Sequence, residues 1–341
     1  MSRHRLGLWA DRLRIGLISA SLITVAACGG TGATTNPSAA ASTSPSSQAG
    51  SSAGELPPGV TAIPLDADFY SVASGAEGLW LLSPAGRVIE IDKTTDQVIA
   101  DIQVPVSEYG YIALGAGSVW VTSFDHDSLI RIDPTTKKVI ATIAVGTNPE
   151  GLLVTPDTVW TANHRGGSIS KVDVATNKVV ATFDFANPGS SGPKGLVMAA
   201  GDLWTTVPNR VSVFRLSPKT GKVVARKTLL HEDLDSPVSD GRFVFVATSD
   251  GTFEKIDPAT NAVVEHLTPQ LIPWLFTRSS FWGATGQALV RLDPSTLEPA
   301  ESWRITPESA GPLDVMGMAV DDDTAWLIVG GQTLVRVDIG R

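Results

Sequence analysis

Short apolar runs alternate with polar turns along the chain from about residue 60 to its end. The runs are rich in Val, Ile, Thr and Trp, and Gly, Pro and Asp separate them, which is typical of strands in a β-meander. One stretch shows the pattern most clearly and predicts strands at 111–114, 118–123, 129–133 and 139–145. Apolar residues at helical spacing are absent from this region, so the pattern predicts an all-β fold.

The strand pattern repeats with a regular period, and a Trp marks most of the copies. The markers are Trp80, Trp120, Trp160, Trp204, Trp282 and Trp326, with Val244 at the place of the missing fifth Trp. Successive markers lie about 41 residues apart on average, which is the period of a four-stranded propeller blade. We therefore predict a seven-bladed β-propeller of four-stranded antiparallel blades over residues 59–341.

The two ends of this region predict how the ring closes. The seventh copy stops after its third strand, at Arg341, whereas an unpaired apolar segment, Val60–Leu65, precedes the first copy. That segment can serve as the missing outer strand of the last blade, which removes an open sheet edge. We expect the N-terminal strand to join the last blade and close the propeller.

Turn-forming residues follow the third strand of nearly every copy. Asp or Ser ends the strand, Pro often comes next, and Thr lies three residues after the Asp or Ser. These are the preferences of a type I turn, in which the side chain accepts a backbone N–H. We interpret the aspartates as turn residues rather than as a ring of metal ligands. They are Asp92, Asp133, Asp173, Asp257, Asp293 and Asp338.

A charged residue stands two positions before each of these turns. Residues two apart in a strand share a face, so each charge can lie beside the turn or reach the next blade. We interpret these charges as structural ion pairs and not as a site. The set is Glu90, Arg131, Lys171, Arg215, Lys255, Arg291 and Arg336.

The first 27 residues have the layout of an export signal. Four arginines precede an apolar stretch, Ile15–Ala27, which is shorter than the roughly 20 residues of a transmembrane helix. The stretch ends in Val25-Ala26-Ala27-Cys28, which resembles the bacterial lipobox; the alternative is an ordinary secretory peptide followed by a chance Cys. The resemblance implies a lipoprotein signal peptide over 1–27 and a lipidated Cys28, which anchors the protein to the extracytoplasmic side of the cell membrane.

Residues 28–58 connect this anchor to the repeats. Apart from Cys28, the segment consists mostly of Gly, Ser, Thr, Ala and Pro, and Glu55 is its only charge. Such a composition buries too little apolar surface to offset the entropy of ordering, so it predicts a flexible tether.

Charge and cysteine content narrow the classes of function. The net charge of −9 becomes −12 without residues 1–27, because that segment holds four Arg and one Asp. An acidic body of this kind excludes nucleic acid as an expected partner. Cys28 is the only Cys, so no disulfide forms within one chain. We expect a monomer whose membrane contact is the lipid on Cys28.

The second copy also carries a family resemblance. Its segments Ser118–Thr122, Ile130–Pro134 and Ala141–Ile143 are similar to the seven-bladed propellers of the virginiamycin B lyase-like and YVTN repeat families. The resemblance covers residues 59–341 and implies the propeller fold. These families include an antibiotic-opening lyase and many members that resemble binding or scaffolding proteins, and the resemblance assigns no catalytic residue to this chain.

Candidate site residues lie in two sets of loops that we expect on one face of the ring. The joining loops, between the second and third strands of a blade, carry polar side chains, as do the leading loops before the first strands. We predict a polar, partly aromatic binding face. From the joining loops it takes Asp125, His126, Asn163, His164, Arg165 and Arg210, and from the leading loops Glu150, Lys194 and Trp274.

Three of these residues are also weak candidates for catalysis. His126 and His164 occupy equivalent loops of neighbouring blades, and Glu150 comes between them. Two imidazoles and a carboxylate are ligands that hold a divalent metal, which can polarise an ester or lactone carbonyl. The alternative is that the histidines are solvated polar residues; no other cofactor is expected.

Three functions fit these observations. The first is a non-catalytic binding or scaffolding module for a protein, an envelope polymer or a small ligand on the loop face. The second is a metal-assisted lyase or hydrolase of an extracellular ester or lactone. The third is a structural component of an envelope assembly that uses the rim of the propeller.

Overall fold

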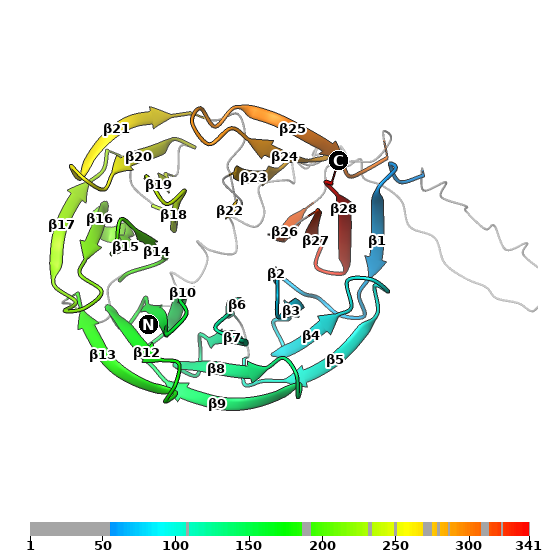
Figure 1. Ribbon diagram of the computed structural model, residues 1–341, viewed down its shortest axis with the longest axis horizontal. Helices are drawn as coiled ribbons and strands as arrows, with labels where there is room; N and C mark the ends of the chain where they lie inside the picture. Colours follow the sequence, from blue (N-terminus) through cyan, green and yellow to red (C-terminus); the bar gives the residue numbers. More distant parts are fainter. Residues whose placement is uncertain are drawn as a thin grey trace, which may run out of the picture. The chain divides into compact units, whose positions relative to one another are not determined.

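The structure is a computed structural model, and it describes residues 55–106, 109–185, 192–230, 234–248, 251–268, 275–277, 280–285, 287–307, 314–321 and 323–340. Within these ranges the chain forms seven four-stranded antiparallel sheets arranged as the blades of a ring, which confirms the predicted all-β propeller (Figure 1). The predicted signal peptide, Cys28 and most of the tether lie outside the described residues. No helix in the described ranges has the length and apolar character needed to span a membrane.

Each of blades 1 to 4 is built from four strands that follow one another in sequence. Blade 1 contains β2 (Ser71–Gly75), β3 (Gly78–Leu82), β4 (Arg87–Ile91) and β5 (Val98–Gln103). Blade 2 contains β6 (Ile112–Gly115), β7 (Ser118–Ser123), β8 (Ser128–Asp133) and β9 (Lys138–Ala144). Blade 3 contains β10 (Pro149–Val154), β11 (Thr158–Asn163), β12 (Ser168–Asp173) and β13 (Lys178–Asp184). Blade 4 contains β14 (Leu196–Ala199), β15 (Asp202–Val207), β16 (Ser212–Leu216) and β17 (Val223–Thr228), with one turn of 3-10 helix at Pro208–Arg210.

Blades 5 and 6 are also built from consecutive strands, whereas the last blade departs from this pattern. Blade 5 contains β18 (Pro237–Ser239), β19 (Val244–Ala247), β20 (Phe253–Asp257) and β21 (Ala262–Leu267). Blade 6 contains β22 (Leu275–Thr277), β23 (Ser280–Ala284), β24 (Ala288–Leu292) and β25 (Pro299–Arg304). Blade 7 contains β26 (Val315–Val320), β27 (Thr324–Val329) and β28 (Thr333–Asp338), and its outer strand is β1 (Val60–Pro64).

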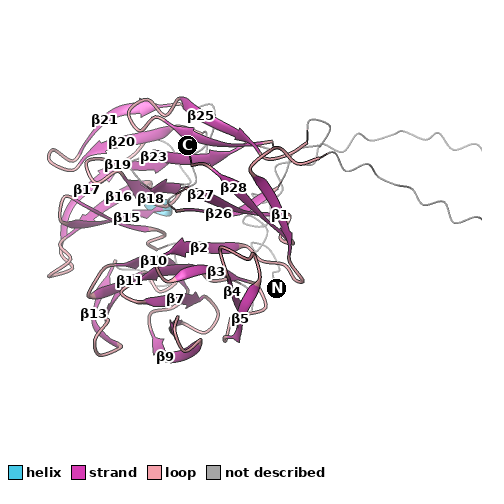
Figure 2. Ribbon diagram, turned by 45° about the vertical axis from the view of Figure 1, so that its right-hand side comes forward, coloured by secondary structure: helices cyan, strands magenta, loops and turns pink. Residues whose placement is uncertain are grey.

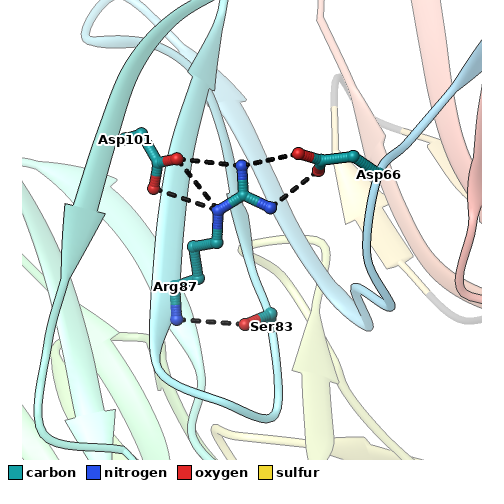
Figure 3. Close-up of polar contacts among 4 residues, drawn as sticks. All are labelled: Asp66, Ser83, Arg87 and Asp101. Atoms are coloured by element: carbon teal, nitrogen blue, oxygen red, sulfur yellow. Dashed lines mark hydrogen bonds and ion pairs between the residues drawn. The ribbon is translucent and has the colours of Figure 1, made fainter.

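The pairing of β1 with β28 confirms the predicted closure. The two strands run antiparallel, with Val60 opposite Val337 and Pro64 opposite Thr333. They lie side by side in both views of the ring (Figures 1 and 2). The segment after β1 is also held, because the Arg87 guanidinium donates to Asp66 at 2.7 Å and contacts Asp101 at 2.8 Å (Figure 3). Both carboxylates raise the pKa of Arg87, so the cation persists at every physiological pH.

The core lies between blades, in seven apolar clusters. Trp80 packs with Val119 and Ile130 of blade 2, and Trp326 packs with Leu79 and Ile89 of blade 1. The second strands are almost wholly buried, whereas outer strands such as β5 alternate between exposed and half-buried positions. Each marker side chain therefore fills the gap to the next blade, and burial of this apolar surface holds the ring together.

The fifth marker is Phe245, so the prediction of Val244 was wrong by one residue. Phe245 lies opposite Lys255, just as Trp120 lies opposite Arg131 in blade 2. Phe245 packs toward blade 6, whereas Val244 packs toward blade 4, because neighbouring residues in a strand point to opposite faces.

Most of the charged residues before the turns join neighbouring blades. Arg131 stacks on Trp120, with its guanidinium carbon 4.9 Å from the ring centroid, and donates to the Val174 carbonyl of the next blade at 2.7 Å. Lys171 and Arg215 stack on the Trp of their own blades and reach the next blade in the same way. We call these contacts the latch ring, which comprises Glu90 with Lys137, Arg131, Lys171, Arg215, and Arg336 with Asp96.

Two of the predicted charges stay within their own blades. Lys255 contacts Glu265 at 3.0 Å, and Arg291 contacts Glu301 at 2.6 Å. The turn interpretation of the aspartates is confirmed as well: Asp133 Oδ1 accepts the backbone N–H of Thr135 at 2.8 Å and that of Thr136 at 3.1 Å. These bonds lower the pKa of Asp133.

Candidate functional site

Leading and joining loops share one face of the ring because of strand pairing. The first two strands of a blade are antiparallel, so the start of the first lies beside the end of the second, as Pro149 lies beside Asn163. Backbone bonds extend the pairing into the loops: His164 N–H donates to the Asn148 carbonyl at 2.8 Å, and Phe124 N–H to the Tyr109 carbonyl at 3.1 Å. We call the surface made by both sets of loops the loop face.

One position in the leading loops is equivalent in the six blades where the structure describes it. It lies three residues before the first-strand residue that pairs with the marker Trp or Phe. In these blades the position holds an aromatic residue, a glycine, an acidic, a basic, a second acidic and an apolar residue in turn. From blade 1 onward they are Tyr70, Gly110, Glu150, Lys194 and Asp235, with Met316 in blade 7.

Glu150 and His164 meet on the loop face of blade 3. Glu150 is the extra residue of a bulge in β10, where Pro149 pairs with Asn163 and Gly151 with Ala162. Bulges re-aim a side chain and are frequent beside active sites. The Glu150 carboxylate lies 3.5 Å from His164 Nδ1, and the two side chains are only 9% and 16% exposed.

The environment changes the acidity of both groups. Burial raises the pKa of Glu150 to about 7, and Lys194 opposes this shift only in part. Burial also lowers the pKa of His164, so its imidazole is neutral at pH 7. His164 Nδ1 is buried without a hydrogen-bond partner. Near neutral pH the pair therefore combines a partly protonated carboxyl group with a neutral imidazole.

Further ionisable side chains converge on this pair from blades 2, 4 and 5. Lys194 is 6% exposed, and its ammonium contacts the Asp235 carboxylate at 3.0 Å. Tyr111 of blade 2 is 43% exposed as a whole residue, but loss of water around its hydroxyl raises its pKa, and the charges of Glu150 and Asp235 add to the shift. The first strands of these blades also contact one another, β6 with β10, β10 with β14 and β14 with β18, so the leading loops before them approach each other.

A row of aromatic rings adjoins this cluster. Tyr109 contacts Tyr70 edge to face, with ring centroids 6.0 Å apart, and Phe124 at 6.4 Å. The Tyr70 hydroxyl donates to the Gly110 carbonyl at 2.9 Å, which fixes its ring. The Arg165 guanidinium carbon lies 5.9 Å from the centroid of Phe124, at the other end of the row. Tyr109 remains 48% exposed.

The other predicted site residues have different surroundings. Exposed His126 contacts Ser123 Oγ through Nδ1 at 3.1 Å, and Asp125 is exposed beside it. Asn163 is fully buried, and its amide bonds to Ser168 and Ser170 within the blade. Arg210 donates to the Phe185 carbonyl at 2.9 Å. Trp274 lies outside the described residues.

The donor set does not fit the predicted metal ion. Glu150 and His164 lie together, but no group of three or more His, Cys, Asp or Glu side chains that could hold a metal occurs in the described part of the chain. His126 is engaged by Ser123 instead. Among the described residues, Glu150 and His164 alone are too few to hold a metal ion here.

The sequence places Tyr109 among the leading-loop residues of the binding face, but the importance of Tyr70 and Tyr111 was missed. The chain has three Tyr, namely Tyr70, Tyr109 and Tyr111, and all of them lie in the leading loops of blades 1 and 2. Tyr70 and Tyr111 directly precede apolar runs, so they are easily taken as strand residues. Their restriction to two neighbouring loops was the available signal.

Solved structures with the same fold include three of streptogramin B or virginiamycin B lyases. A streptogramin B lyase has a TM-score of 0.65 at 15% identity, covering 82% of this chain and 97% of that one. Virginiamycin B lyase from Staphylococcus aureus has a TM-score of 0.66 at 15% identity, covering 83% and 99%. Its catalytically inactive variant with quinupristin has a TM-score of 0.63 at 14% identity, again covering 83% and 99%. At these identities the likeness shows the fold alone.

Sequence comparison adds the family. No curated protein matches the chain. The profile of the family described as outer membrane protein assembly factor BamB matches residues 165–339, from the joining loop of blade 3 to the end of blade 7. That match spans more than half of the 341 residues, so this chain belongs to the family described as outer membrane protein assembly factor BamB.

Proposed function

We propose that this protein is a lipid-anchored, extracytoplasmic binding module that takes its ligand on the loop face without chemical change. The single observation that carries the proposal is the restriction of all three tyrosines to neighbouring leading loops of that face. Tyrosine offers a large apolar surface and a polar tip at low conformational cost, which is why binding surfaces use it. The buried residues of the blade cores are mainly Trp, Phe, Val, Ile and Leu instead, although Tyr70 also packs against the cluster between blades 1 and 2.

Rigid support for the exposed tyrosines favours binding further. Tyr109 is about half exposed, yet its ring is held between Tyr70 and Phe124. A side chain already ordered in the free protein loses little entropy when a ligand covers it, so more of the contact energy appears as affinity. We expect a monomer that contacts the membrane through its lipid, with a protein, an envelope polymer or a small molecule as ligand.

The membrane anchor depends on the lipobox-like sequence that ends at Cys28. Two acyl chains give stable attachment, at about 0.8 kcal/mol per buried CH₂. The full chain expressed in a bacterium should incorporate labelled palmitate and sediment with membranes. Cys28→Ser should abolish both properties, and a variant that still incorporates label would contradict the anchor.

Site-specific crosslinking tests binding on the loop face. A photoreactive phenylalanine is placed at Tyr109 in one variant and at Val180 in a matched control, because Val180 is 56% exposed on the outer strand β13. Irradiation of intact cells should give a discrete adduct from position 109 and none from position 180. Equal adducts from both positions would favour the structural hypothesis, in which the rim matters more than the loop face.

A lyase or hydrolase of an extracellular ester or lactone is the second candidate, and the approach of His164 to Glu150 favours it. A carboxyl group with a pKa of about 7 beside a neutral imidazole suits general acid–base chemistry. The purified full chain would be assayed with a panel of esters and lactones and analysed for bound metal, together with His164→Ala and His126→Ala. Turnover that only His164→Ala abolishes would replace the binding proposal.

A further inference from the structure

The loop face has two unlike halves. From blades 3 to 5 the equivalent leading-loop position carries Glu150, Lys194 and Asp235. From blades 7 and 1 it carries Met316 and Tyr70. A ligand that covers this face meets ionisable groups on one side and aromatic or apolar groups on the other, so its own chemistry must change along its length.

Lys194 and Asp235 form an ion pair within the charged half, which is the half from blades 3 to 5. Their contact of 3.0 Å joins a buried ammonium to a carboxylate that is 56% exposed. An additional anion placed here would have to compete with Asp235 for Lys194, and it would lie near a second carboxylate, Glu150. This half is therefore a poor site for an anionic ligand.

Glu150 forms no such close ion pair in the described part of the chain, although the charge of Lys194 offsets part of the effect of its burial. Its side chain is 9% exposed, and the contact that the described residues give it is His164 at 3.5 Å, which is longer than a hydrogen bond. His164 Nδ1 has no hydrogen-bond partner either. A largely buried carboxyl group that receives no hydrogen-bond donor from the described residues gains most from a ligand that brings one, and an ammonium group brings three.

The tyrosines provide the rest of a cation site. Loss of water raises the pKa of both Tyr70 and Tyr111, and carboxylates add to the shift, Asp125 for Tyr70 and Glu150 with Asp235 for Tyr111. Aromatic faces attract cations, and tyrosines beside a carboxylate commonly bind ammonium groups. The half-exposed ring of Tyr109 offers adjoining apolar surface.

We propose that the loop face binds a ligand in which an ammonium group lies beside an aromatic or other apolar ring. The ammonium contacts Glu150 and Tyr111, and the ring packs on Tyr109. This inference rests on the proposed binding function and adds the chemical class of the ligand.

Two probes of matched shape and opposite charge test the inference. The full chain is titrated with 2-phenylethylammonium and with 3-phenylpropionate, and binding is followed by saturation-transfer NMR and calorimetry. The ammonium probe should bind at least about tenfold more tightly, which corresponds to one charge-assisted contact of about 1.4 kcal/mol. Equal or tighter binding of the propionate, or no binding of either probe, would overturn the inference.

Variants locate the two contacts. Glu150→Gln keeps the shape and should reduce the ratio of the two affinities to about one, whereas Tyr109→Ala should weaken both probes by about threefold to tenfold. Tyr111→Ala, at a site that is 43% exposed, gives a second test of the charge preference if Glu150→Gln disturbs folding. Glu265→Gln on the outer strand β21 is the matched control and should change nothing. A control that moves the ratio as much as Glu150→Gln would overturn the assignment.

The crosslinking experiment separates this inference from the proposed function. An adduct from position 109 together with no preference for the ammonium probe would support the proposed binding function and contradict the inference about the chemical class of the ligand. Absence of both the adduct and the preference contradicts the two proposals together.

Discussion

The latch ring and the loop face are built from two equivalent positions of the repeated blade, and the two positions differ in how much they vary from blade to blade. Opposite the marker Trp or Phe, six of the seven described blades carry Arg or Lys, and four of these cations stack on the Trp of their own blade or reach the next one. Three residues before the partner of the same marker, the leading loops carry Tyr, Gly, Glu, Lys, Asp and Met. Every blade must pack on a neighbour, so the first position repeats; only some blades meet a ligand, so the second varies.

This comparison predicts that stability and binding can be changed separately. Marker side chains such as Trp120 and Trp80 are fully buried, whereas Tyr109 and Tyr111 are nearly half exposed. Substitutions in the core should therefore cost free energy of unfolding, and substitutions on the loop face should change recognition at little cost.

Deletion of residues 59–66 should have the largest effect, because it opens the ring. It removes all pairing of β1 with β28 and the contact between Asp66 and Arg87. We expect the melting temperature measured by circular dichroism to fall by more than about 10 °C, since several kcal/mol are lost. Deletion of residues 40–47 from the predicted tether is the control and should leave the curve unchanged. An unchanged curve for the first deletion would contradict closure by β1.

Trp120→Ala should destabilise the protein by about 3–5 kcal/mol in urea denaturation, because it leaves a cavity between blades 2 and 3. Trp120→Phe should cost less than half as much, since Phe245 fills the equivalent place in blade 5. Equal costs for the two variants would show that the marker position requires indole in this blade.

The sequence predicted the repeated part of the molecule well, for a physical reason. The period, the strand order, the ring closure and the turn aspartates depend on residues that recur in every blade. Because there are seven copies, an irregular residue in one copy does not hide the repeat. The error at Val244 arose because blade 5 has no Trp, which is the residue by which the other copies are aligned. The cross-strand partner Lys255 identifies Phe245 instead.

The loop face was predicted less completely, because its contacts join residues that no repeat relates. The contact of Glu150 with His164 depends on a bulge in β10 that changes the direction of the Glu150 side chain. No feature of the local sequence predicts this bulge. Asn163 illustrates the opposite case: a polar residue in a loop-like sequence is the last residue of β11 and is buried.

Glu150→Gln should stabilise the protein at alkaline pH. The folded-state pKa of about 7 exceeds the ordinary 4.5, so Glu150 favours the folded state only while it is protonated. Its effect on stability is most favourable below about pH 4.5 and is lost as the pH rises through 7. The variant should gain up to about 3 kcal/mol relative to the wild type at pH 8, as the free-energy equivalent of this pKa difference.

Urea denaturation at several pH values measures this gain, which should disappear near pH 4.5. The control, Glu265→Gln, should show no such trend, because Glu265 is 46% exposed and contacts Lys255. A pH-independent effect of Glu150→Gln would mean that the carboxyl group is ionised in the folded protein without penalty.

Arg131→Met should cost about 1–2 kcal/mol, because it removes the stacking on Trp120 and bonds to the next blade. Arg291→Met should cost less than about 1 kcal/mol, since Arg291 pairs with Glu301 in its own blade and both are about one-third exposed. Urea denaturation of the two variants compares a latch with an ordinary ion pair. A larger cost for Arg291→Met would contradict the structural importance of the latch ring.

Tyr109→Ala should have the smallest effect on stability and the clearest effect on recognition. About half of the side chain faces solvent, and its ring contacts are to Tyr70 and Phe124 on the loop face rather than to any blade core. Its free energy of unfolding should stay within about 0.5 kcal/mol of the wild type, while its affinity for 2-phenylethylammonium falls several-fold. A loss of stability as large as that of Trp120→Ala would place Tyr109 among the structural residues, and the division between the two regions would then not hold at this position.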